Sequence, residues 1–118
     1  MSKLKLAVGL IAAIAILAVA PLALAHTHAA QATTVTVKAS EFKFVLSKKS
    51  APHGKVTFKV TNKGHISHDF KIAGKKTPML SPGKSATLKV TLKKGKYKYL
   101  CTVPGHASAG MKGTFKAS

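Results

Sequence analysis

The chain has 118 residues, a formal charge of +18 and one cysteine. This length allows one domain, and a single cysteine excludes a fold held together by intramolecular disulfides. All basic residues are lysines, 20 in number, against two acidic residues, Glu41 and Asp69. Such a charge also occurs in nucleic-acid-binding proteins. The chain has no arginine and no aromatic stacking platform, however, so we do not expect a nucleic acid partner.

Residues 1–25 have the features of a secretory signal peptide. Two lysines precede an apolar run, residues 6–25, which ends in the small-residue pattern Ala-Leu-Ala. Cleavage after Ala25 would remove both lysines and leave residues 26–118 with a charge of +16, down from +18. Retention as a membrane anchor is the alternative, because about 20 apolar residues span a bilayer. In both cases the lysines favour a cytoplasmic start, so we expect an exported domain in the periplasm or outside the cell.

Residues 26–33 show no strand pattern and predict a short flexible lead. If cleavage follows Ala25, His26 becomes the first residue and His28 the third. A free amine, two deprotonated amides and the imidazole of His28 together bind Cu(II), so His26 and His28 are a candidate secondary copper site. The alternative is a disordered tail with two incidental histidines.

Residues 34–118 predict short β-strands separated by turns. The clearest strand covers residues 85–92, where Ala86, Leu88, Val90 and Leu92 lie on one face and lysine and threonine lie on the other. Most lysines are therefore expected on solvated strand faces. The other predicted strands cover residues 33–38, 41–45, 56–60, 68–72, 96–101 and 113–116. Seven short strands without a helical pattern predict a single all-β sandwich domain.

Residues 101–111 read Cys-Thr-Val-Pro-Gly-His-Ala-Ser-Ala-Gly-Met, and they place a thiolate, an imidazole and a thioether close together. These ligands select copper over magnesium or calcium, and zinc sites do not usually include methionine. A buried, inert Cys101 is the alternative, but it would not account for His106 and Met111. Two histidines, one cysteine and a weak axial methionine form a blue-copper site. The sequence therefore predicts one copper ion and a second histidine upstream.

Tyr97, Tyr99 and Cys101 share one face of their predicted strand, so the thiol is expected to point into the interior at the strand end. Among the upstream histidines, His53 lies in a Pro-His-Gly turn and is expected to be exposed. His65 and His68 both follow an Asn-Lys-Gly turn. Spacing favours His68, because an alternating strand follows it, but leaves His65 open.

Two segments together resemble the cupredoxins, the plastocyanin and azurin group of small blue copper proteins. One is Asn62-x-Gly64-x-x-x-His68-Asp69-Phe70, and the other is Tyr97-x-Tyr99-x-Cys101-x-x-Pro104-Gly105-His106 followed by Met111. The resemblance covers residues 34–118 and implies a Greek-key β-sandwich. It also implies copper bound by His68, Cys101, His106 and Met111.

The resemblance further implies that His106 lies near the surface as the port for electrons. The apolar residues expected around it are Pro104, Gly105, Ala107, Ala109 and either Met79 or Leu80. The four-residue gap between Cys101 and His106 is similar to that of azurin or auracyanin. Asp69 stands where plastocyanins and azurins commonly have asparagine, whose side chain ties the ligand loops together. An ionised carboxylate cannot donate that hydrogen bond, so the tie is not predicted here.

The expected function is that of a small blue copper protein that carries single electrons through Cu(II) and Cu(I). Its partners would be redox proteins with an acidic docking surface, and the lysines also favour anionic envelope surfaces. We expect a monomer. An enzyme is not expected, because copper nitrite reductases and multicopper oxidases need further copper centres and domains. The alternative is a periplasmic or extracellular copper chaperone or storage protein.

Overall fold

The computed structural model describes residues 32–118. The expected signal peptide or anchor (1–25), the candidate secondary copper site at His26 and His28, and residues 26–31 of the lead lie outside the described residues. Across residues 32–118, no helix is long and apolar enough to cross a membrane.

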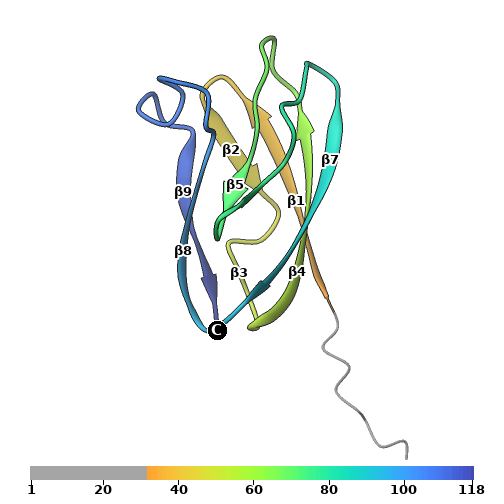
Figure 1. Cartoon of the computed structure of the whole chain (residues 1–118), viewed down its shortest axis with the longest axis vertical. Coiled ribbons are helices and arrows are strands. Elements are labelled where there is room, and N and C mark those ends of the chain that lie inside the picture. The colour runs from red at the N-terminus through yellow and green to blue at the C-terminus, as the bar shows by residue number, and fades with distance from the viewer. Residues whose placement is uncertain (1–31) are drawn as a thin grey trace, which may run out of the picture.

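Two β-sheets face each other in the described part of the chain, which forms nine strands (Figure 1). The first sheet has the order β2 (Lys43–Leu46), β1 (Thr33–Ser40), β4 (Gly54–Asn62) and β7 (Ser85–Leu92). The second has the order β3 (Ser50–Ala51), β9 (Lys112–Ala117), β8 (Gly95–Leu100), β5 (Lys71–Ile72) and β6 (Lys75–Lys76). The β1–β4 and β3–β9 pairs are parallel, and the others are antiparallel. The predicted all-β sandwich is confirmed.

The strands of the first sheet alternate between buried apolar and exposed polar residues. In β7, Leu88, Val90 and Leu92 are buried while Lys89 is exposed. In β4, three apolar side chains spaced two residues apart are fully buried: Val56, Phe58 and Val60. Each such side chain contributes about 1.5–3 kcal/mol by leaving water. This hydrophobic gain places the lysines between them on the outer face, as the sequence predicts.

An aromatic cluster joins the two sheets and supports the end of the sandwich. The ring of Phe70 lies 5.2 Å from the rings of both Phe44 and Phe58, and 5.5 Å from that of Tyr99. These are favourable distances for aromatic pairs. Phe70 follows His68 by two residues, and Tyr99 precedes Cys101 by two. The buried cluster therefore anchors both chain segments that carry the predicted ligands.

Several local expectations differ from the structure. The predicted strand 41–45 begins later, as β2, and Glu41 and Phe42 form a turn instead. The predicted strand 68–72 is reduced to β5. His68 makes only an isolated bridge with Leu80, and Asp69 and Phe70 are buried outside any strand. The strands β3 and β6 were not predicted, because two residues are too short for a periodic pattern. β1 begins at Thr33, where this strand was predicted to begin, although the domain was expected to start at residue 34.

Candidate metal centre

His68 lies in the loop after β4, and its backbone is bonded on both sides. Its N–H donates to the carbonyl of Leu80 at 3.0 Å, and its carbonyl accepts from the N–H of Leu80 at 2.8 Å. The buried Asn62 side chain donates to the carbonyls of Ile66 and Leu80, both at 2.8 Å, and accepts from the N–H of Gly64 at 2.8 Å. One asparagine therefore fixes the loop that carries His68.

Cys101, His106 and Met111 lie on one loop between β8 and β9, and backbone hydrogen bonds close this loop on itself. The N–H of Cys101 donates to the carbonyl of Met111 at 3.1 Å, and the N–H of Met111 donates to the carbonyl of His106 at 3.0 Å. The N–H of His106 donates to the carbonyl of Val103 at 3.0 Å. These bonds hold the three residues close together although four residues lie between His106 and each of the other two.

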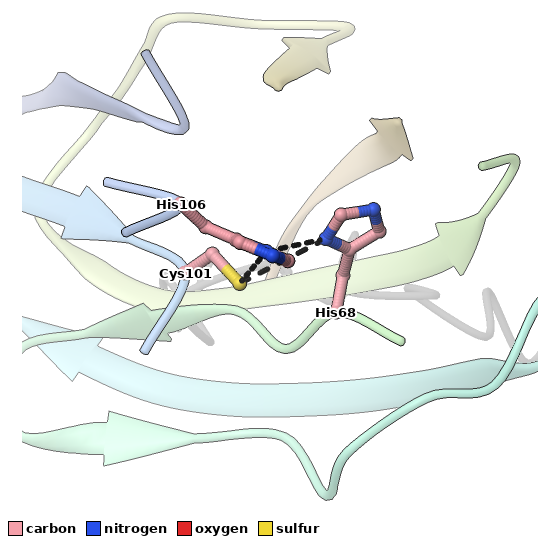
Figure 2. Close-up of side chains that lie close together, drawn as sticks. All are labelled: His68, Cys101 and His106. Atoms are coloured by element: carbon pink, nitrogen blue, oxygen red, sulfur yellow. Dashed lines mark hydrogen bonds between the residues drawn. The ribbon is translucent and has the colours of Figure 1, made fainter. Parts of the chain in front are cut away.

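The side chains of His68, Cys101 and His106 point toward one another (Figure 2). Cys101 directly follows β8. The two Nδ1 atoms lie 3.1 Å apart, and Sγ of Cys101 lies 3.9 Å from Nδ1 of His68 and 3.6 Å from Nδ1 of His106. Two atoms bound to one ion through bonds of about 2.0–2.3 Å are at most about 4–4.6 Å apart. All three separations lie below this limit, so the three atoms can share a single ion.

The site is closed to water on nearly all sides. His68 and Met111 are 0 % exposed, Cys101 is 1 % exposed and His106 is 8 % exposed. Met111 packs with Cys101 and Ala39 in a small apolar cluster. Burial raises the pKa of the Cys101 thiol, while the backbone amides of Asp69 and Val103 act to lower it. A thiol in such surroundings is a poor proton donor to water and a suitable ligand for a soft metal ion.

Both acidic residues of the chain contact this site. The carboxylate of Asp69 accepts hydrogen bonds from the Thr102 backbone amide, at 2.6 Å, and from the Thr102 hydroxyl. Oε1 of Glu41 accepts from the amides of His65, at 2.7 Å, and Ile66, at 2.8 Å. Burial acts to raise the pKa of the Glu41 carboxyl, but these amide hydrogen bonds outweigh it and lower the pKa to about 2. Both carboxylates thus tie a ligand loop to the rest of the site.

The family model of the cupredoxin-like domain matches residues 11–115. The chain belongs to the cupredoxin-like family. The match starts within the expected signal peptide and covers all described strands but the end of β9. A cupredoxin fold that brings His68, Cys101, His106 and Met111 close together fits a single type 1 copper site.

Solved structures with the same fold include two auracyanins. One is the sodium-dithionite-reduced auracyanin of the photosynthetic bacterium Roseiflexus castenholzii, with a TM-score of 0.66 and 24% identity over 74% of this chain and 98% of that one. The other is auracyanin B, with a TM-score of 0.62 and 24% identity over 74% of this chain and 89% of that one. At this identity the likeness shows the fold. No curated protein sequence matches the chain.

The cupredoxin structure brings His68, and not His65, to the cluster. His65 is exposed and contributes its backbone amide to Glu41. His53 is also exposed, and its Nδ1 lies 2.9 Å from the carbonyl oxygen of Ser118. The preference for His68 over His65 therefore agrees with the geometry.

The apolar surroundings of His106 differ in part from the expectation. Pro104, Gly105 and Ala109 are exposed, and Ala107 is half-buried. Met79 is exposed, whereas Leu80 is buried and pairs with the backbone of His68, so Leu80 does not belong to this surface.

Two residues near the centre, Glu41 and Phe42, were not predicted to belong to it. The ring of Phe42 meets the ring of His106 edge-on at 5.0 Å, and Glu41 contacts His68. The one feature of the sequence that could have indicated a role for Glu41 is that the chain has only two acidic residues. A hydrogen bond between the ligand loops through residue 69 was not predicted. It does exist, with the Asp69 carboxylate as the acceptor and Thr102 as the donor.

Proposed function

We propose that the protein is an exported one-electron carrier, with copper bound by His68, Cys101, His106 and Met111. The observation that supports this most is the convergence of one thiolate and two imidazoles, 3.1–3.9 Å apart, inside a rigid β-sandwich. Two imidazoles, one thiolate and one thioether are the ligand set of a blue-copper site, so these four residues would hold the ion. Copper bound there supplies the change between Cu(II) and Cu(I).

The buried backbone frame favours electron transfer over release of the ion. Cu(II) and Cu(I) prefer different geometries in solution, whereas here backbone hydrogen bonds hold the ligand loop of Cys101 and Met111 closed. His68 is fixed in the same way by its pairing with Leu80. A site that moves little keeps the reorganisation energy small. The same closure slows the release of metal, which disfavours the copper chaperone or storage role.

His106 is the proposed port for electrons. It is the ligand with the largest exposed fraction, 8 %, against 0–1 % for His68, Cys101 and Met111. Exposed apolar residues lie beside it in the chain or in space, namely Pro104 and Phe42, the latter 41 % exposed. An apolar surface of this kind favours short-lived contact with a partner, because it is desolvated at little cost.

The proposed partner is a redox protein with an acidic surface. Glu41 and Asp69 are the only acidic side chains in the sequence, and both are engaged in hydrogen bonds inside the site. Exposed Lys43 directly follows Phe42, and exposed Lys112 directly follows Met111. The rim of the site is therefore positive, which steers acidic partners toward His106. We also propose that the carrier is a monomer and has no enzymatic activity of its own.

The experiment that tests the proposed function is an optical and EPR titration of the purified protein with Cu(II). We expect an intense visible thiolate-to-copper band, narrow hyperfine splitting and a reversible one-electron couple. Cys101→Ser and His68→Ala should lose the band, and His65→Ala is the matched control that should keep it. A colourless wild-type protein, or a band that survives Cys101→Ser, would overturn the proposal. Rapid transfer of copper to a chelator would favour the chaperone role instead.

A further inference from the structure

Nε2 of His68 is the single side-chain nitrogen or oxygen that is fully buried without a hydrogen-bond partner in residues 32–118. Oε1 of Glu41 lies 3.4 Å from it, slightly beyond the usual 2.7–3.2 Å of an N–H···O bond. An unsatisfied buried donor costs about 1–3 kcal/mol. The carboxylate of Glu41 is the group placed to accept a hydrogen bond from Nε2 of His68.

The position of Glu41 is fixed by the loop that leads to His68. Its Oε1 accepts from two consecutive amides, those of His65 at 2.7 Å and Ile66 at 2.8 Å. Gly64 lies so close that a Cβ at this position would overlap the carboxylate. Glycine at position 64 thus makes room for the acidic group. Oε1 of Glu41 therefore faces three nitrogen atoms from residues 65–68: the amides of His65 and Ile66, and Nε2 of His68.

The tautomer of His68 decides whether Glu41 can accept a hydrogen bond from Nε2. The Nδ1 atoms of His68 and His106 lie 3.1 Å apart, and a hydrogen bond between them needs a proton on one of the two. When both Nδ1 atoms are metal ligands, neither carries a proton. The neutral imidazole of His68 then carries its proton on Nε2, the atom that faces Glu41.

We propose that Glu41 is a positioning residue of the copper centre, whose carboxylate accepts the Nε2 proton of His68 and so sets the reduction potential. This inference rests on the proposed function. A carboxylate that accepts a proton from a ligand imidazole fixes the orientation of the ring and makes the ring a stronger donor. A stronger donor favours Cu(II) over Cu(I), so Glu41 lowers the potential.

Phe42, the next residue, lies against the other imidazole ligand. Its ring meets His106 edge-on at 5.0 Å, and a Cβ at Gly110 would lie 3.0 Å from its carbonyl oxygen. The turn between β1 and β2 therefore contacts the loop of His68 through Glu41 and the loop of His106 through Phe42. One short turn from outside the ligand loops holds both of them.

The variant Glu41→Gln tests the inference, because glutamine keeps the shape and the oxygen that accepts from His65 and Ile66. We expect it to keep the visible band and to lower the ratio of Cu(II) to Cu(I) affinity about tenfold. For a one-electron couple, tenfold is a rise in potential of about 59 mV. Glu41→Gln removes the negative charge of the acceptor and keeps an acceptor oxygen. The control Ser67→Lys makes the net charge more positive by the same unit at an exposed position beside His68, while the Glu41 carboxylate stays in place. It should shift the potential much less.

A second measurement uses the wild-type protein alone and does not depend on the folding of a variant. In the Cu(I) form, NMR should show the Nε2 proton of His68 protected from exchange with solvent, since it is buried and bonded to Glu41. Rapid exchange of this proton, an unchanged potential in Glu41→Gln, or an equal shift in Ser67→Lys would each overturn the role of Glu41. A wild-type protein without a blue band would overturn the proposed function itself, and this inference with it.

Discussion

Asp69 and Thr102 join the two ligand loops: the carboxylate of Asp69 accepts from both the backbone amide and the hydroxyl of Thr102. Asp69 directly follows His68, and Thr102 directly follows Cys101. Asp69 is 2 % exposed, so the charged hydrogen bonds are shielded from water. A bond between these neighbours holds the imidazole and the thiol at a constant separation.

Removal of the Asp69 carboxylate should destabilise the protein. In Asp69→Ala the amide of Thr102 loses its acceptor, and we expect the free energy of unfolding to fall by about 1–3 kcal/mol. Thr102→Val removes the hydroxyl bond but keeps the amide bond, so its cost should be smaller, about 0.5–1.5 kcal/mol. Urea unfolding of the metal-free proteins measures both. Equal losses in the two variants would contradict the dominant role of the amide bond.

The stability of the metal-free protein should fall at alkaline pH because of Cys101. Burial raises the pKa of its thiol above the ordinary value of 9.0. Above that value the unfolded chain loses the thiol proton while the folded chain keeps it, so the free energy of unfolding falls as pH rises. Urea unfolding at pH values below and above the ordinary pKa, compared with Cys101→Ala, isolates this effect. The two proteins differ only at position 101, so parallel pH profiles would count against this effect.

Met111 should tune the potential without being needed for the colour. Met111→Leu conserves volume in a fully buried position, so we expect a loss of less than about 1.5 kcal/mol. Loss of the weak axial donor should raise the potential, while the thiolate band remains. Met79→Leu is the matched control, since Met79 is 52 % exposed. Voltammetry of the copper-loaded variants measures the effect, and similar shifts in both would exclude an axial role for Met111.

The positive rim of the site should control the rate of electron transfer to anions. With hexacyanoferrate(III) as oxidant, we expect the rate for the wild-type protein to fall as ionic strength rises. Lys43→Glu and Lys112→Glu should each lower the rate at low salt, because they reverse a charge beside the site. Lys55→Glu, near the start of β4 at the far end of the sandwich, is the charge-matched control. Stopped-flow measurements that give equal rates for all three variants would refute local steering.

The sequence predicted the strands whose apolar residues alternate and the ligands that lie close together in the chain. The pattern of β7 is confirmed because burial of Leu88, Val90 and Leu92 depends on a local period of two. The spacing of Cys101, His106 and Met111 was readable because one closed loop carries them.

The remaining features depend on contacts between distant segments. Glu41 meets His65 and Ile66 across 24 and 25 positions, and no periodic pattern predicts such a contact. The segment from His68 to Phe70 was predicted as a strand, yet its three side chains have different buried partners. His68 lies against Cys101 and His106, and Phe70 packs in the aromatic cluster. Asp69 turns inward because Thr102 offers two donors.

The parallel pairing of β1 with β4 determines where the domain is attached to the preceding chain. Thr33 lies opposite Val56, near the start of β4, whereas Asn62 at the end of β4 supports the loop of His68. Eight residues at about 3.3 Å each separate the entry of the chain from the metal end by roughly 26 Å. The proposed copper centre therefore lies at the end of the sandwich opposite the point where the chain enters the domain, so a surface attached at that point would not cover it.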